Sequence, residues 1–175
     1  NAAALGERAA EAEASYRALA AQLSAKRELA AHDLEGRVTE VMQHLAMTGG
    51  RLEIALEPLA TPASHGVEQI EFRVASHPKQ PLGPLAKVAS GGELSRIALA
   101  IQVVTSEVGA VPTLVFDEVD AGIGGAVAAT VGAQLQALGA HRQVLCVTHL
   151  PQVAAFADTH FRVIKRGDAE AVRAD

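Results

Sequence analysis

An acidic pair follows a short apolar stretch in the second half of the chain. Asp117 and Glu118 come directly after Thr113-Leu114-Val115-Phe116, a run that is typical of a strand covered on both faces. An aspartate in this place can hold Mg²⁺, directly or through water, and a neighbouring glutamate can orient or deprotonate an attacking water. The pair therefore suits phosphoryl chemistry, although such a pair also occurs in ordinary solvated loops.

A histidine ends a second apolar run. Thr148 and His149 follow Val144-Leu145-Cys146-Val147, which also predicts a buried strand. Ligands of parallel α/β sheets bind beyond the carboxyl ends of the strands, so we expect Asp117, Glu118 and His149 to gather there. His149 could hydrogen-bond a terminal phosphate, or it could be structural.

A glycine turn precedes both runs. Ser90 and Glu93 have the spacing of a capping box, and Gly91 and Gly92 between them leave backbone N–H groups uncovered at a predicted helix start. Such a start suits an anion, because its N–H donors are unpaired and it carries about half a positive charge. An ordinary capped helix explains the turn equally well. The apolar positions predict one buried helix face, formed by Leu94, Ile97, Ala98, Ile101 and Thr105/Val108.

Strands and helices alternate after this turn. A helix is expected between Val127 and Gly139, another begins at Pro151, and Phe161-Arg162-Val163-Ile164-Lys165 predicts a last strand. Alternation of this kind predicts an α/β fold with a mostly parallel sheet and flanking helices.

The first part of the chain has a different pattern. Residues 1–47 predict one Ala-rich helix, roughly 65–70 Å long, with a heptad-like apolar seam. We interpret it as one arm of a coiled coil; the alternative is a helix packed on its own domain. Residues 48–175 form the second predicted domain. It begins with two strands around Ile54 and Phe72, separated by a loop at 58–66 and followed by a linker at 76–84.

Composition limits the possible classes of protein. The 175 residues are 49% hydrophobic and 3% aromatic, so a core of Ala, Val, Leu and Ile is affordable. The net charge of −5 gives no global case for nucleic-acid binding. One cysteine, Cys146, precludes an internal disulfide, and no run of about 18 apolar residues predicts a membrane span. Since the chain does not begin with Met, we expect it to be a piece of a longer protein.

Three strings resemble the motifs of ABC-type ATPases. The stretch from Ala89 to Glu93 is similar to their signature motif, 113–118 to the Walker B strand, 119–123 to the D-loop, and His149 to the switch histidine. The fuller strings VASGGELSR, FDEVDAGIGG and VTHLPQVAA closely resemble the RecN family of bacterial DNA-repair proteins, relatives of the SMC and cohesin ATPases. The resemblance covers roughly residues 35–165.

The resemblance implies a C-terminal half of an ATPase head that uses ATP and Mg²⁺. Asp117 would serve Mg²⁺, Glu118 the attacking water and His149 the γ-phosphate in the site of this head. Asp120 would help to couple two sites across a dimer of heads. The signature residues that would cap ATP bound by the second head are Ser90, Gly91, Gly92 and Glu93.

The same resemblance implies partners. No G-x-x-x-x-G-K-[ST] string occurs in the chain, so the phosphate loop would come from an N-terminal Walker A half, and this chain alone would be inactive. Two heads would form a homodimer that clamps ATP and tethers DNA in double-strand-break repair, in the cytoplasm with the nucleoid and without a membrane partner.

Two other functions stay open. One is a non-catalytic coiled-coil tether that retains nucleotide-binding residues; the intact Asp117, Glu118 and His149 argue against it. The other is the ATPase subunit of a transporter. Two differences from the usual motifs argue against a transporter: Ala89-Ser90 where Leu-Ser is usual, and Gly122-Ile123 where transporters commonly have Leu-Asp. Four basic residues that were considered as DNA contacts are interpreted as ordinary surface charges: Lys87, Arg96, Arg162 and Lys165.

Overall fold

The computed structural model describes residues 2–88, 90–106, 111–164 and 173–174. They form two compact units, Asn1–Ala89 and Ser90–Asp175. Ala89 and Lys165, which belong to two of the predicted patterns, lie outside the described residues. The division into a coiled-coil arm and an ATPase lobe at residues 47/48 stays a prediction, because the long helix shares its unit with the strands that follow it.

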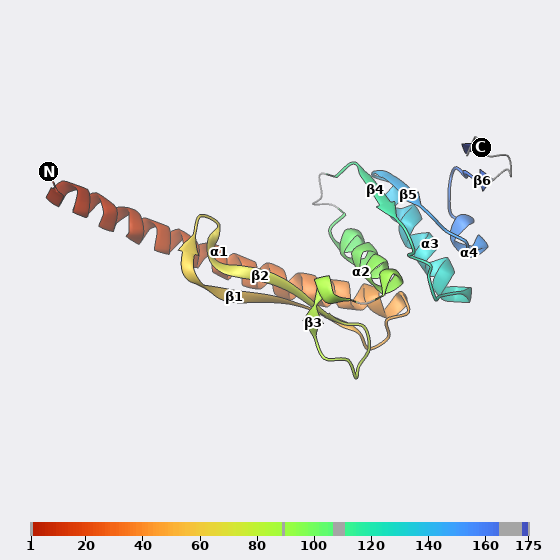
Figure 1. Cartoon of the computed structure of the whole chain (residues 1–175), viewed down its shortest axis with the longest axis horizontal. Helices are drawn as coiled ribbons and strands as arrows, with labels where there is room; N and C mark the ends of the chain where they lie inside the picture. The colour runs from red at the N-terminus through yellow and green to blue at the C-terminus, as the bar shows by residue number, and fades with distance from the viewer. Residues whose placement is uncertain (1, 89, 107–110, 165–172, 175) are drawn as a thin grey trace. The chain divides into compact units, whose positions relative to one another are not determined.

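The first unit is built on the predicted N-terminal helix, α1 (Ala2–His44). Its 43 residues correspond to about 65 Å of helix. The N-terminal part of α1 runs on beyond the tip of a hairpin that lies along the rest of the helix (Figure 1). Leu5 and Leu19, two positions of the expected seam, are each 66% exposed. The coiled-coil interpretation of this part of the helix stays a prediction.

The hairpin consists of β1 (Arg51–Ala63) and β2 (Gly66–Ala75), paired antiparallel with Leu52 opposite Val74. The loop expected at residues 58–66 is wrong, since both strands continue to a tight turn at Ser64 and His65. Pairing is irregular between Pro58 and Ala63. Because β1 is an edge strand of the sheet, prolines without an N–H are tolerated there.

The linker expected at 76–84 is also partly structured. Its last residues form β3 (Gly83–Pro84), which pairs with β2, and a short 3₁₀ helix, η1 (Leu85–Lys87), follows. The sheet order is β1-β2-β3. Two paired residues are too few to give a periodic signal in the sequence. The prolines and the glycine of this segment therefore led to the prediction of a linker.

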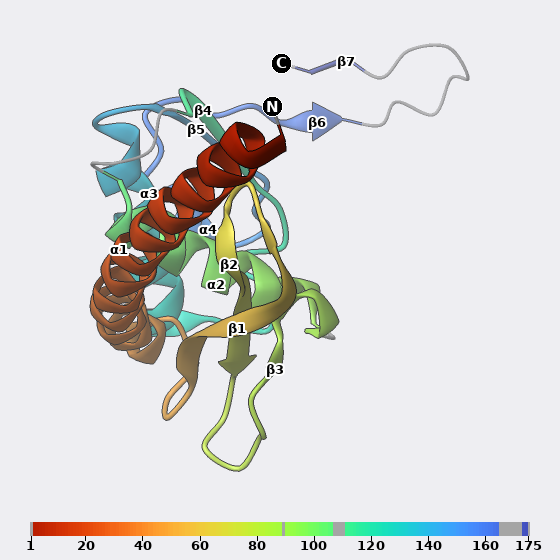
Figure 2. The same ribbon diagram turned by 90° about the vertical axis from the view of Figure 1, so that its left-hand side faces the viewer.

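Side chains of α1 hold the hairpin in place. The backbone N–H groups of Leu52 and Ile54 donate to Thr39 Oγ1 (3.1 Å) and Glu35 Oε1 (2.6 Å). These bonds occupy donors on the open edge of β1, which an uncovered strand would offer to other chains. The C-terminal part of α1 is therefore packed within its own unit, with the hairpin crossing alongside it (Figure 2).

The second unit contains the predicted α/β pattern. Strands β4 (Thr113–Phe116) and β5 (Gln143–Cys146) pair in parallel, with Phe116 opposite Cys146, and α3 (Gly125–Gly139) connects them. The turn at Ser90 opens α2 (Gly91–Val104), and Pro151 begins α4 (Pro151–Ala154) as expected. The parallel strand–helix–strand unit is confirmed.

Two expectations for this unit hold only in part. The last strand forms as β6 (Val163–Ile164), which is shorter than expected and pairs antiparallel with β7 (Arg173–Ala174). Of the positions expected on the buried face of α2, Ile97 is buried, Leu94 is 41% exposed, and Val108 lies outside the described residues. The buried positions of α2 are Gly92, Arg96, Ile97, Leu99 and Ala100.

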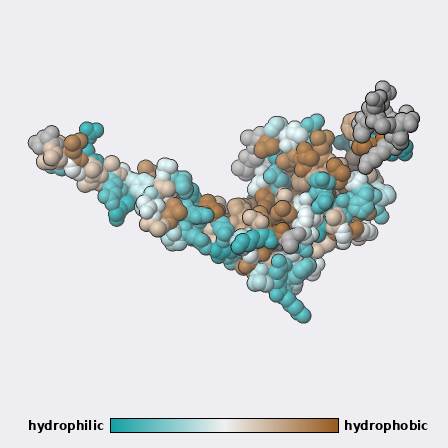
Figure 3. Space-filling view, in the orientation of Figure 1, coloured by the Kyte–Doolittle hydropathy of each residue, from teal (hydrophilic) through white to brown (hydrophobic). Residues whose placement is uncertain are grey.

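The parallel strands were expected to be covered on both faces, and one side is open. Val115 is 68%, Leu145 44% and Val147 62% exposed. Hydrophobic surface gathers over this unit in Figure 3. Parallel strands are normally covered on both faces, whereas this side of the sheet is an exposed apolar surface within the described part of the second unit. Among the described residues, no helix is long and apolar enough to cross a membrane.

Candidate active site

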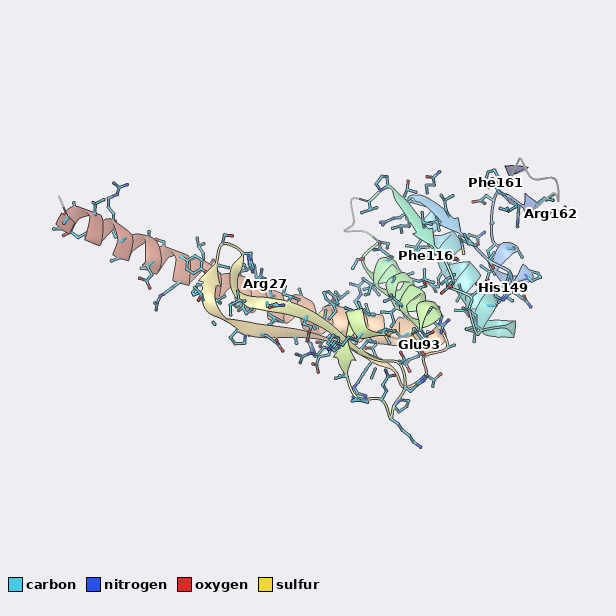
Figure 4. The ribbon with its side chains drawn as sticks, in the orientation of Figure 1. Arg27, Glu93, Phe116, His149, Phe161 and Arg162 are labelled. Carbon is cyan, nitrogen blue, oxygen red and sulfur yellow. The ribbon has the colours of Figure 1, made fainter. Side chains whose placement is uncertain are left out.

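The glycine turn caps helix α2. Ser90 has an extended backbone, and its Oγ accepts a hydrogen bond from the Glu93 N–H at 3.4 Å. Glu93 also places a negative charge in the first turn, where the helix dipole favours one. Its position at the start of α2 can be followed in Figure 4. The predicted Ser90 cap is confirmed.

The two glycines allow the segment after β4 to approach α2 closely. A Cβ at Gly92 would lie 2.9 Å from the Ala121 Cβ and 3.1 Å from its carbonyl oxygen. A Cβ at Gly91 would overlap Oε2 of Glu118. The carboxylate of Glu118 therefore lies against this helix start, where the N–H groups favour negative charge.

Two neighbours on α2 fix the same segment, and the sequence analysis missed both. Ser95 Oγ donates to the Asp117 carbonyl at 2.6 Å, and Arg96 Nη1 donates to the Ala121 carbonyl at 2.8 Å. Arg96 is 6% exposed, so its interpretation as a surface charge is wrong. Burial lowers the pKa of the Arg96 guanidinium, and the charge of Glu93 opposes that shift. The spacing from Gly92 to Arg96, one helical turn, is the signal that could have revealed this face.

The acidic pair is exposed and conformationally unusual. Glu118 has a φ of +57°, a left-handed conformation that is uncommon without glycine and costs of the order of 1–3 kcal/mol. Its N–H donates to Asp117 Oδ1 at 2.9 Å. This geometry holds the Glu118 carboxylate over the start of α2 while Asp117 stays at the end of β4.

The carboxylate of Asp117 at the end of β4 can serve as one of the oxygen ligands of Mg²⁺. The described residues include no group of three or more His, Cys, Asp or Glu that could hold a metal by themselves. Mg²⁺ is commonly bound by one or two carboxylates together with phosphate and water oxygens. Asp117 can therefore supply one ligand and not a complete site.

Asp120 and His149 are brought together. Asp120 is 2% exposed, and its Oδ2 accepts hydrogen bonds from the Thr148 hydroxyl and from the His149 backbone N–H, the latter at 3.0 Å. His149 Nδ1 lies 3.3 Å from the same oxygen, and the histidine side chain is 69% exposed. Burial raises the pKa of Asp120, but the hydrogen bonds from Thr148 and His149 outweigh it, so this pKa is lower than usual.

The expected gathering of three groups is thus only partly seen. His149 lies beyond the carboxyl end of β5 (Figure 4). Among the described residues, the carboxylate that lies close to its ring is that of Asp120 rather than that of Asp117 or Glu118. The roles expected for these residues in a reaction stay predictions.

The fold of the chain is that of SMC ATPase head domains. The Smc head domain with a coiled coil and joint from Pyrococcus yayanosii matches 86% of this chain, using 27% of its own, with a TM-score of 0.62 and 22% identity. A chain from structural work on ATP-driven dimerization and DNA stimulated activation of SMC ATPases matches with a TM-score of 0.50, 85% coverage of both chains and 22% identity. Identity at this level shows the fold alone.

Sequence similarity defines the branch. The DNA repair protein RecN of Xylella fastidiosa (strain Temecula1) is 51% identical over 163 residues, which are 92% of this chain and 29% of that protein. RecN of Deinococcus radiodurans is 49% identical over 145 residues, 82% of this chain and 25% of the relative. No family model matches the chain. The chain belongs to the RecN family, as the motif strings predicted, and it spans less than a third of the length of these curated relatives.

Proposed function

We propose that the chain is the C-terminal part of an SMC-like ATPase that acts in DNA double-strand-break repair. The observation that carries this proposal is the 41–51% identity to DNA repair proteins named RecN over most of the chain. In the complete protein, ATP-driven dimerisation of heads and ATP hydrolysis would tether DNA. Such a protein works where bacterial DNA lies, in the cytoplasm with the nucleoid.

The residues that follow β4 and β5 would each have a separate role in ATP hydrolysis. Asp117 would supply a carboxylate to Mg²⁺, which neutralises phosphate charge when it is bound. Glu118 would accept a proton from the attacking water, and His149 would hydrogen-bond the γ-phosphate. Glu118 lies against Gly91, so a phosphate arriving at that turn would meet its carboxylate and repel it. This repulsion would free Glu118 as the second head docks.

The missing Walker A half is the first proposed partner. The exposed apolar side chains of β4 and β5 support it, because a parallel sheet surface of this kind needs a cover. An N-terminal half of the same protein would bring both that cover and the phosphate loop.

The second proposed partner is another head. Ser90, Gly91, Gly92 and Glu93 would cap ATP held by that head, and Asp120 would help to couple the two sites. The exposure of Ser90 and Gly91 supports this role, since a ligand of a second head could reach these two residues.

A charge placed in the turn tests head association. In the complete protein, Ser90→Arg should abolish ATP-dependent dimerisation measured by light scattering, because a bulky cation would fill the space meant for phosphate. Ser64→Arg, in the exposed hairpin turn, is the matched control and should dimerise normally. Dimerisation of the Ser90→Arg protein at the control level would mean that the turn is only a helix cap.

A further inference from the structure

We infer that Asp120 is a positioning residue that orients His149 from within its own chain. The inference deepens the proposed function and rests on it, because it concerns how His149 would face the γ-phosphate. It adds a cis role to a residue that the motif resemblance connects only with a second head.

The parallel pairing of two strands sets the geometry. Phe116 lies opposite Cys146, and the Val147 N–H donates to the Phe116 carbonyl at 2.9 Å, so β4 and β5 end level with one another. The turn after β4 places Asp120 Oδ2 3.0 Å from the backbone nitrogen of His149, which follows β5. A carboxylate placed in this way can reach both the backbone and the side chain of His149.

The contacts converge on one buried oxygen. Asp120 Oδ2 accepts hydrogen bonds from the Thr148 hydroxyl and from the His149 backbone N–H, and it lies 3.3 Å from His149 Nδ1. Asp120 is 2% exposed, whereas the His149 side chain is 69% exposed. The buried end of the pair is thus fixed, and the ring can still reach a ligand in solvent.

This arrangement selects the protonated ring nitrogen. A carboxylate oxygen only accepts hydrogen bonds, so an unprotonated Nδ1 would direct its lone pair at another acceptor. A proton on Nδ1 removes that repulsion and leaves Nε2 as the atom for a ligand. A hydrogen bond to a phosphate oxygen would then be donated from Nε2, on the side of the ring away from Asp120.

A double-mutant cycle in the complete protein tests the inference. Asp120→Asn keeps the side-chain shape and an acceptor but removes the charge, and it should lower kcat for ATP at least about tenfold, by analogy with a buried aspartate that orients a catalytic histidine. In a His149→Ala background the same change should alter kcat less than about twofold, because Asp120 would have no ring left to orient. An equal loss in both backgrounds would overturn the inference, because a general structural defect acts without His149.

A second measurement is made on the wild-type protein and needs no change at Asp120. Nitrogen-15 NMR of the histidine-labelled complete protein, with the signal assigned through His149→Ala, should show a proton on Nδ1 of His149. An Nε2–H tautomer with bare Nδ1 would overturn the inference. If the wild-type protein does not hydrolyse ATP, the proposed function fails, and the NMR result still decides the Asp120–His149 relation. If it hydrolyses ATP and Asp120→Asn leaves kcat unchanged, the inference fails alone.

Discussion

At the scale of single residues, the close approach of Gly92 to Ala121 makes a stability prediction. Gly92→Ala should destabilise the chain by about 1–3 kcal/mol, because the new methyl meets a carbonyl and a Cβ that cannot easily move. The free energy of unfolding in urea measures this change. Gly139→Ala is the control, since it also lies in a helix and a Cβ there would meet nothing within 4 Å. A destabilisation no larger than that of the control would contradict the packing described for α2.

Cys146 provides a prediction of pH dependence. Burial, together with the charges of Asp120 and Asp117, raises the pKa of its thiol to about 11. The thiolate is the reactive form, so alkylation by iodoacetamide should be slow at pH 7 and rise about tenfold per pH unit up to pH 10. In denaturant, the rate should level off near the unperturbed pKa of 9.0. A folded chain whose rate also levels off there would show that the thiol is not buried.

The sequence reveals some of these residue-scale features and hides others. Ser90 was recognisable because a cap depends on residues three positions apart. Arg96 was overlooked, because its spacing from Gly92 marks only a helix face, and the burial of its guanidinium depends on the Ala121 carbonyl, 25 positions away. The left-handed conformation of Glu118 was equally hidden, since local propensity favours another backbone for glutamate.

At the scale of elements, one tyrosine ties the hairpin tip to α1. The Tyr16 hydroxyl contacts two carbonyls, those of Ala63 at 2.8 Å and Gly66 at 3.0 Å. Tyr16→Phe should cost about 1 kcal/mol and speed hydrogen exchange of the amides at the tip. Arg17→Gln removes only an exposed ion pair with Glu13 and should leave exchange unchanged. Equal exchange in wild type and Tyr16→Phe would mean that the tip of the hairpin does not depend on Tyr16.

The elements predicted well are those with a strong local pattern. Four-residue apolar runs marked β4 and β5, and Pro151 marked the start of α4. The extension of β1 past Pro58 was missed because its edge position is a property of the sheet. We expected β4 to be covered on both faces because of its apolar composition, but among the described residues Val115 is exposed; such a cover depends on packing that a four-residue run does not encode.

At the scale of the whole molecule, the open sheet surface predicts an association. Val115→Glu should change the stability of this chain by less than about 1 kcal/mol, because the side chain is 68% exposed. The same substitution should abolish binding to a separately produced N-terminal half, measured by titration calorimetry. Ile70→Glu, at a 42% exposed position of β2, is the control and should bind normally. Undiminished binding of Val115→Glu would show that the N-terminal half does not cover β4.

ATP turnover tests the central claim most directly, namely that this chain supplies part of an ATPase site that other segments complete. Turnover should appear when this chain is combined with its N-terminal half, and Glu118→Gln should lower it roughly 10²-fold or more, because the water loses its proton acceptor. Neither half alone should turn over ATP. A combined protein whose rate is unchanged by Glu118→Gln would contradict the account.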